Sequence, residues 1–448
     1  MKRRRACPEC DLVVTLPPLR AGESASCPRC NRELTYRPRA PAERVLAYCV
    51  AALVMLFLTL PFAFMQFDLG SAQQTIVLLD TAAAFRNSAW PVLAILIIAT
   101  IIVLPGLYLL AVAYVYTGIA ARRYLPGSVW LARALSQIKP WLMTDVFLVG
   151  VLVSLVKLLS LAVVSLGPSF WAFCGYVVCM VKTVANIDSD WMWFALKGEP
   201  KAPFVARPGQ DALAQGVVGC PTCGLLNRVE QGYCRRCARK IRIPGRHSVQ
   251  QTSSLLIAAT ILYIPANVYP MMHTNSLNGS TTSTILGGVW QMFEYGSYFV
   301  AAVIFFASIV IPVAKILVLS WLCYVVVHAS AIPPQKRMRW FRVVELIGRW
   351  SMIDVFVVAV MVALIQAGVL LSIQPGPAAL AFAAVVVLTM LAAMTFDPRA
   401  LWQPQRAELA AWLSSKSASK LTPQLSSELS SELSPELSKK EELHDRAL

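Results

Sequence analysis

The chain carries the pattern Cys-x2-Cys four times, in two groups of two, and each group stands just before a block of apolar segments. The eight cysteines are Cys7, Cys10, Cys27 and Cys30 in the first group and Cys220, Cys223, Cys234 and Cys237 in the second. Two Cys-x2-Cys turns can bring four thiolates to one tetrahedral metal ion, and zinc accepts four sulfur ligands. The spacing therefore predicts two closed structural zinc sites, with iron or a thiol redox pair as the alternatives.

The composition is typical of a polytopic membrane protein. Of the 448 residues, 57% are hydrophobic and only 14% are charged, a balance that soluble proteins of this length rarely have. Eight stretches come near the roughly 20 residues that a helix needs to cross a bilayer. They are 44–65, 90–118, 142–165, 169–187, 252–272, 298–327, 351–373 and 377–396.

The positions of the positive residues indicate how these spans are oriented. With the N-terminus inside, 36 of the 40 lysines and arginines fall in cytoplasmic segments, and only Arg86 falls outside. Cytoplasmic loops of membrane proteins carry such an excess of positive charge. We therefore expect both termini and both cysteine groups in the cytoplasm. The net charge of +16 then reflects membrane topology and not nucleic-acid binding.

The two halves of the chain repeat one another. Trp141-Leu-Met-Thr-Asp-Val-Phe147 matches Trp350-Ser-Met-Ile-Asp-Val-Phe356, and an even number of spans in each half makes the repeats parallel. The predicted fold is an all-α polytopic membrane protein with two tandem four-helix transmembrane modules, each preceded by a small cytoplasmic zinc ribbon. The expected boundaries are ribbon 1 at 1–40, module 1 at 41–190, a linker and ribbon 2 at 191–247, module 2 at 248–400 and a disordered Ser/Leu/Glu-rich tail at 401–448.

Five polar residues in or beside the spans are candidates for contact with a substrate or for coupling. Lys157 and Lys315 lie near the middle of spans, where a charge costs about 2.5–3.5 kcal/mol on insertion scales and normally faces a cavity, a partner or an ion pair. Asp145 and Asp354 stand at equivalent helix starts, where they serve either as N-terminal stabilisers or in a proton or interface role. Asn267 offers an amide at membrane depth, either in a polar cavity or at the end of a kinked helix.

The cytoplasmic segment 336–350 is predicted to form a basic amphipathic helix. Arg339, Arg342 and Glu345 recur at helical spacing with apolar residues between them, a pattern typical of helices at the membrane surface. The alternative is a solvated basic face that only sets topology. The sequence shows neither a phosphate-binding glycine loop nor a nucleophile–base pair, so we predict that the protein is not an enzyme.

In combination these motifs resemble the paraquat-inducible protein A family of bacterial inner-membrane proteins. The resemblance covers roughly residues 5–402. It rests on the doubled ribbons, Tyr263-Ile-Pro-Ala-Asn-Val-Tyr-Pro-Met-Met272, Thr284-Ile-Leu-Gly-Gly-Val289, Ser308-Ile-Val-Ile-Pro312 with Lys315, and Trp350-Ser-Met-Ile-Asp-Val-Phe356. The first half departs from the second, because Tyr108 stands in the place of Lys315 and Gln366 in the place of Lys157.

The resemblance implies a multi-pass inner-membrane partner of a mammalian-cell-entry (MCE) domain protein, which forms a periplasmic tunnel between the two bacterial membranes. The implied task is to load or receive phospholipid at a cavity between the two modules. Two other classes of function stay open. One is a proton-coupled small-molecule exporter, and the other is a membrane redox protein that uses the cysteine groups as metal or dithiol centres.

Overall fold

Seven helical stretches in the described part of the chain are long and apolar enough to cross a membrane. They are Pro41–Thr59, Ala99–Ala120, Ser128–Leu155, Pro168–Asn186, His247–Val268, Ala301–Val327 and Pro377–Thr395. Each overlaps one of the predicted spans, as expected of a polytopic membrane protein. The remaining predicted span, 351–373, lies outside the described residues except for Val357 and its last three positions.

The structure is a computed structural model, and most of the chain up to residue 402 is described. The described residues are 3–68, 73–77, 95, 98–159, 163–200, 204–241, 246–276, 279–294, 296, 298–328, 332–348, 357 and 371–402. Residues Met1–Leu401 form one compact unit. The predicted tail at 401–448 lies outside the described residues apart from its first two positions.

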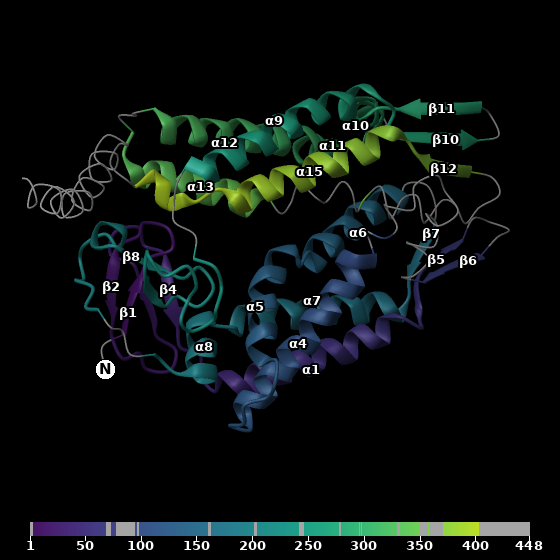
Figure 1. Ribbon diagram of the computed structural model, residues 1–448. Helices are drawn as coiled ribbons and strands as arrows, with labels where there is room; N and C mark the ends of the chain where they lie inside the picture. Colours follow the sequence, from purple (N-terminus) through teal and green to yellow (C-terminus); the bar gives the residue numbers. More distant parts are fainter. Residues whose placement is uncertain are drawn as a thin grey trace, which may run out of the picture. The chain divides into compact units, whose positions relative to one another are not determined.

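The first half of the chain folds mainly into helices (Figure 1). Their bounds are α1 (Pro41–Thr59), α4 (Leu104–Ala120), α5 (Ser128–Ile138), α6 (Thr144–Leu159), α7 (Pro168–Asn186) and α8 (Ser189–Lys197), with a 3-10 turn at Lys139–Trp141. Val45, Cys49, Ala52 and Leu56 recur every three or four residues along α1 and are all buried. This spacing gives α1 one continuous face against its neighbours.

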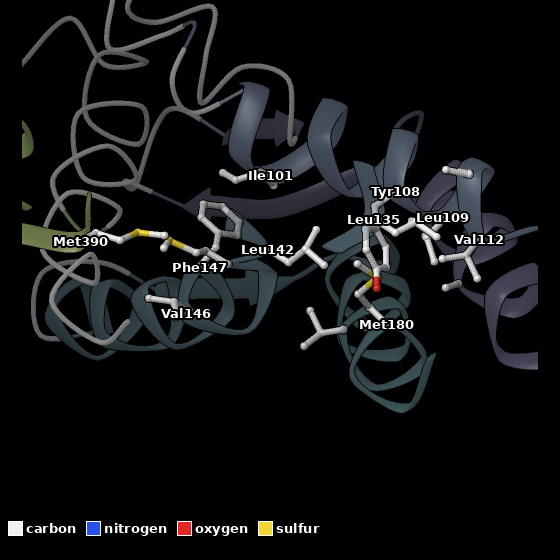
Figure 2. Packing of buried hydrophobic residues seen from close by; sticks show 14 of the residues in the cluster. Ile101, Tyr108, Leu109, Val112, Leu135, Leu142, Val146, Phe147, Met180 and Met390 are labelled. Atoms are coloured by element: carbon white, nitrogen blue, oxygen red, sulfur yellow. The ribbon is translucent and has the colours of Figure 1, made fainter. Parts of the chain in front are cut away.

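The core of this half is apolar. Figure 2 shows Tyr108 of α4, Leu135 of α5 and Met180 of α7 converging on one region, with Phe147 of α6 in the same cluster. Phe147 meets Phe173 of α7 edge to face, with ring centroids 5.5 Å apart. Because lipid tails are as apolar as these side chains, close packing holds membrane helices together more than exclusion of water does.

The second half shows a corresponding order of elements. Its helices are α9 (Arg246–Val268), α10 (Ile285–Glu294), α11 (Tyr298–Phe305), α12 (Ile311–Val327), α13 (Pro334–Gly348) and α15 (Pro377–Thr395), with a 3-10 turn at Pro398–Leu401. The helices α9 and α15 pack against each other along their length. Ser248 joins them near the N-terminal end of α9, where its hydroxyl donates to the Thr395 carbonyl over 2.6 Å.

A π-helical turn occurs once in each half, directly before a long helix that has proline as its second residue. The turn Ala99–Val103 precedes α4 with Pro105, and the turn Phe306–Val310 precedes α12 with Pro312. Proline has no backbone N–H to donate one turn back, so the preceding carbonyls need a different pairing. The wider π-helical turn gives these carbonyls other hydrogen-bond donors in place of the missing one.

Two small antiparallel sheets lie at the ends of the long helices away from the cysteine groups (Figure 1). Their strands are β5 (Ala63–Asp68), β6 (Gln73–Val77) and β7 (Val163–Leu166), in the order β6-β5-β7, and β10 (Met272–Ser276), β11 (Gly279–Ser283) and β12 (Leu371–Pro375), in the order β11-β10-β12. The all-α prediction was therefore wrong for 63–65, 163–165, 272 and 371–373, which the sequence placed in helical spans. An apolar run of a few residues fits a strand as well as a helix, and one partner in each sheet, β7 for β5 and β12 for β10, lies about 100 residues away in the sequence.

One glycine in each half closes the junction between its sheet and the helix that follows. A Cβ on Gly167 would lie 2.0 Å from the Ala63 carbonyl oxygen, and a Cβ on Gly376 would lie 2.1 Å from the Pro270 carbonyl oxygen. The N–H of Gly167 donates to the Phe64 carbonyl over 3.2 Å, and the N–H of Gly376 donates to the Met271 carbonyl over 2.8 Å. Only a residue without a side chain allows this approach.

We expect Gly376→Ala to lower the free energy of unfolding by about 1–3 kcal/mol, as for other overpacked sites. The measurement is thermal unfolding of the purified protein in detergent. Gly288→Ala is the matched control, because a Cβ at Gly288 in α10 meets nothing within 4 Å and alanine favours helices. Equal losses in the two variants would contradict the steric argument.

Two cysteine-containing units complete the described fold. The first cysteine unit (3–37) has the strands β1 (Arg3–Ala6), β2 (Val13–Leu16), β3 (Ser24–Ser26) and β4 (Glu33–Tyr36), and the second cysteine unit (204–241) has β8 (Val217–Gly219) and β9 (Leu226–Arg228) with a 3-10 turn at Leu213–Gln215. Each strand pair is antiparallel: β1 with β2, β3 with β4 and β8 with β9. These three hairpins carry three of the four Cys-x2-Cys turns at their ends, and the fourth, Cys234–Cys237, lies inside an isolated bridge between Tyr233 and Lys240.

Candidate functional site

The eight predicted cysteine ligands come together in two clusters of four. Within each cluster all Sγ atoms lie within 4.8 Å of one another, and the residues are buried. The closest Sγ pairs are 3.5 Å apart: Cys7 with Cys30, Cys10 with Cys27, Cys220 with Cys237 and Cys223 with Cys234. A tetrahedral zinc with bonds of about 2.3 Å has sulfur–sulfur edges of about 3.8 Å. The donor sets therefore fit a four-coordinate zinc, and the same four thiolates would also accept iron.

Each Cys-x2-Cys turn closes in the same way, with a left-handed residue directly after its second cysteine. These residues are Asp11, Asn31, Gly224 and Ala238, with φ of 61°, 58°, 69° and 54°. The N–H of each donates to the carbonyl of the first cysteine of its turn, over 2.8–3.0 Å. Asp, Asn and Gly adopt this conformation readily, whereas alanine does so at a cost. The turns are thus built by the backbone and present the thiols inward.

The two cysteine units pack directly against each other. Val13 donates its N–H to Gln210 and accepts from Gly209, both over 2.9 Å. The Asp11 carboxylate accepts the Leu213 N–H over 2.8 Å, and burial raises the pKa of that carboxyl to about 6. A shared apolar cluster that includes Ala6 and residues of both units lies beneath this contact. The two units consequently form one body around two candidate metal centres.

Helix α8 joins this body to the end of α7. Asp188 caps α8 by accepting the Trp191 N–H over 2.8 Å, and the same carboxylate accepts the Tyr36 N–H over 2.6 Å. Asp190, in the first turn of α8, accepts from Arg5 over 2.8 Å and from Arg3 over 3.0 Å. Carboxylates at a helix N-terminus also interact favourably with the helix dipole.

The buried charges around Asp190 depend on one another. Burial alone would lower the pKa of Arg5, but hydrogen bonds to Glu199 and the charge of Asp190 outweigh it, so the pKa is raised. Arg236 is fully buried, and burial together with repulsion from Arg5 lowers its pKa. Burial would raise the pKa of Glu199, yet its hydrogen bond with Arg5 lowers it. Asp190 and Glu199 therefore compensate two buried guanidinium groups.

A second ionic contact joins the first cysteine unit to α13. Glu9, inside the Cys7–Cys10 turn, pairs with Arg342 of α13, whose Nε lies 3.1 Å from Glu9 Oε2 and whose Nη2 also contacts that oxygen. Arg342 Nη2 donates to the Cys30 carbonyl over 2.7 Å. One side chain of the amphipathic helix thus touches both turns of the first metal-type cluster. The Glu9 carboxylate is buried and Arg342 is half-exposed.

A cavity of about 580 Å³ lies beside this contact. Its cationic lining residues are Arg32, Lys139, Lys315 and Arg342, and its apolar lining includes Val344, Leu346, Met390 and Met394. Glu345 is the only carboxylate among the described lining residues. The combination of several cations with apolar walls suits an anionic amphiphile.

Lys315 is the most buried cation of this cavity, with 3% of its surface exposed. A Cβ on Gly348 would lie 3.2 Å from both its Cε and its Nζ, so glycine at the end of α13 leaves room for the ammonium group. Among the described residues, no carboxylate forms an ion pair with Lys315. Lys315 therefore lines a cavity, and its role in substrate contact or coupling stays a prediction.

Of the other predicted coupling residues, Asn267 and Asp145 are not among the described lining residues of this cavity. Asn267 lies near the end of α9, which contains Pro265, and its amide donates to the Tyr263 carbonyl one turn earlier over 2.8 Å. Asp145 lies in the first turn of α6, the position of an N-terminal stabiliser. Lys157 is in α6 with its side chain outside the described residues, and Asp354 lies wholly outside them.

Sequence reasoning missed the charged residues that attach the cysteine units to the helices. Arg5 and Asp190 are 185 positions apart, and Glu9 and Arg342 are 333 apart. A charge beside a metal-type turn or at a helix start gives only a weak signal in a single sequence. The one available sign was Arg342 itself, which belongs to the predicted amphipathic helix.

Comparison with known proteins agrees with these features. The family model of paraquat-inducible protein A matches residues 42–197 and 249–406. Intermembrane transport protein PqiA of Escherichia coli (strain K12) is 38% identical over 401 residues, which cover 89% of this chain and 95% of that protein. No solved structure matches this chain.

Two further relatives are more distant but cover similar lengths. Lipophilic envelope-spanning tunnel protein A of Escherichia coli (strain K12) is 28% identical over 405 residues, covering 88% of this chain and 90% of that protein. A probable intermembrane transport protein of Haemophilus influenzae is 28% identical over 408 residues, covering 89% and 95%. The family model matches both halves of the chain, and one relative exceeds 30% identity over most of its length. The chain therefore belongs to the paraquat-inducible protein A family.

Proposed function

We propose that this protein is an inner-membrane subunit of an MCE-type intermembrane lipid transport system in a bacterium. It would consist of two tandem four-helix modules, with both termini and both zinc-loaded cysteine units in the cytoplasm. Its partner would be an MCE-domain tunnel protein in the periplasm, and its cargo would be phospholipid. The name of its relative, intermembrane transport protein PqiA, supports the transport class.

The observation that carries the proposal is the cavity beside Lys315. It is lined from the first half of the chain by Lys139 and Pro140 and from the second half by α12, α13 and α15. Its cations suit a phosphate group, and its methionines and branched side chains suit the start of acyl chains. A headgroup bound there would be loaded or received between the two halves.

The small-molecule exporter is the second candidate, because Lys315 would equally suit a proton-coupled or anionic solute site. It differs from the proposal in needing no periplasmic partner. Transport of a solute by the purified chain alone in proteoliposomes, without lipid transfer, would favour it. The redox alternative predicts iron or a dithiol in the cysteine clusters, which metal analysis and thiol labelling distinguish from zinc.

Lys315→Met provides the sharpest test of the cavity. It removes the cation that the cavity buries, and a charge-assisted hydrogen bond is worth about 1.5–3 kcal/mol, or roughly 10–100-fold in affinity. We expect lipid transfer from vesicles containing this protein to a purified MCE-domain partner to fall by about that factor. Since the variant also removes the desolvation cost of a buried charge, its thermal stability should hold or rise.

The matched control is Lys182→Met. Lys182 lies near the end of α7 and is exposed, so its replacement should leave both lipid transfer and stability unchanged. A Lys315→Met protein that folds normally and transfers lipid at the wild-type rate would exclude this cavity as the lipid site. Adding Lys157→Met tests whether the second membrane lysine contributes.

A further inference from the structure

The contact between Glu9 and Arg342 connects a metal-type cluster to the cavity wall. Glu9 sits between Cys7 and Cys10, and the carbonyl of Cys30 belongs to another ligand residue of the same cluster. Both groups are held in place when the four cysteines share one ion. Arg342 contacts both and also lines the cavity.

The hydrogen bonds of Arg342 leave one side of its guanidinium group available. Nε and Nη2 donate to Glu9 and to the Cys30 carbonyl, and among the described residues Nη1 has no hydrogen-bond acceptor. A guanidinium fixed at two nitrogens presents the third in a defined direction. The half-exposed Arg342 therefore offers an oriented donor at the cavity.

The burial of Glu9 makes this arrangement more than a surface ion pair. Its side chain is only 6% exposed, and its carboxylate also accepts from Arg32 over 3.0 Å. Arg32 is itself a lining residue of the cavity. Removing the Glu9 charge would thus take away the ionic partner of two cavity arginines at once, leaving Arg342 with its hydrogen bond to the Cys30 carbonyl, and would leave Lys315 untouched.

We infer that Glu9 is a positioning residue that orients Arg342 to bind an anionic phosphate headgroup in the cavity, and that metal loading of the first cysteine cluster sets this orientation. The inference rests on the proposed function for the identity of the headgroup. The coupling itself does not depend on transport. By linkage, an anion bound through Arg342 and a metal bound at the first cluster stabilise each other by the same factor.

The test uses the full-length zinc-loaded protein in detergent and two probes, a short-chain phosphatidic acid and inorganic phosphate. Anion affinity is measured by calorimetry, and metal release by transfer to a chromophoric chelator. Glu9→Gln should weaken binding of the short-chain lipid about 10-fold. It should also speed release of one of the two metal ions by about 10-fold, since groups that support metal ligands typically affect metal affinity by 10–100-fold.

A double-mutant cycle separates positioning from general damage. Once Arg342→Gln is present, adding Glu9→Gln should change anion affinity little, because the two residues act through one contact. Arg339→Gln is the matched control: Arg339 is on the same helix and exposed, and it does not line the cavity. It should leave both anion affinity and metal release unchanged.

Three results would overturn the inference. They are unchanged anion affinity in Glu9→Gln, additive losses in the double variant, and a wild-type protein that binds neither probe. If inorganic phosphate and short-chain lipid bind equally and depend equally on Glu9, the positioning role stands and lipid is excluded as the occupant. The two proposals can therefore fail separately.

Discussion

Cys223→Ser should reduce the metal content from about two zinc ions per chain to about one and destabilise both cysteine units. Cys223 is one of four buried thiols in the second cluster, and a serine hydroxyl is a poor replacement for a thiolate ligand. Structural zinc contributes about 10–16 kcal/mol in small zinc-binding peptides. The units of this protein have short strands and a small apolar core, so we expect them to depend on the metal to a similar extent.

The effect should reach the first cysteine unit because the two units share backbone hydrogen bonds and an apolar cluster. Elemental analysis gives the metal and its stoichiometry, and limited proteolysis reports whether residues 3–37 become accessible. Cys174→Ser is the matched control, since Cys174 lies on α7 outside both clusters. Two metal ions per chain in Cys223→Ser would contradict the assignment of Cys223 as a ligand. An iron absorption band in the wild type would mean that the clusters hold iron and not zinc.

Asp190→Ala should lower the free energy of unfolding of the cysteine units by about 3–5 kcal/mol. Removal of one partner from a buried ion pair leaves an uncompensated charge, and losses of this size are typical. Here two guanidinium groups, Arg5 and Arg236, would remain buried close to each other with only Glu199 to balance them. Trp193 of α8 is fully buried, so its fluorescence can follow the transition in urea.

Asp211→Ala is the corresponding control on the surface. Asp211 pairs with Arg29, and about a third of each side chain is exposed. Exposed pairs of this kind contribute about 0–1 kcal/mol, so this variant should unfold close to the wild type. Equal effects of the two substitutions would mean that burial does not decide the strength of these contacts.

The parts of the fold that the sequence predicts well are those encoded by short-range patterns. The two four-cysteine clusters follow from the spacing of Cys7 and Cys10 and its three repetitions, because each turn is closed by hydrogen bonds within five residues. The spans follow from local apolar runs. Lys315 was identified because a charge in such a run is costly wherever the helix packs.

The parts that were missed depend on contacts between distant segments. The strand β7 pairs with β5, about 100 residues earlier, and neither is marked by an alternating pattern strong enough to override its apolar neighbours. Asp190 has the appearance of an ordinary helix-capping residue, and only the fold brings Arg5 to it. For Asn267 the sequence left two alternatives open, and in the structure its amide donates to a carbonyl of its own helix.

The pairing of α1 with α7 and of α9 with α15 has a mechanical consequence. At the sheet end, α1 and α7 are joined by β5 and β7 and by Ser169, which donates to the Thr59 carbonyl over 2.6 Å. At the other end, Asp188 beyond α7 binds Tyr36 just before α1. The helices α9 and α15 are likewise fastened at both ends, by β10 with β12 and by Ser248 with Thr395.

Because both ends of each pair are fastened, the two helices of a pair resist bending and sliding along each other. The helix α4 packs against α1, and α12 packs against α9 and α15. Each of them directly follows a π-helical turn, where the backbone hydrogen-bond ladder is already irregular. When a protein changes shape, the least rigid segments move most. Any conformational change during the functional cycle of this protein should therefore occur at α4 and α12 and the turns before them, while the helix pairs α1–α7 and α9–α15 move as rigid bodies.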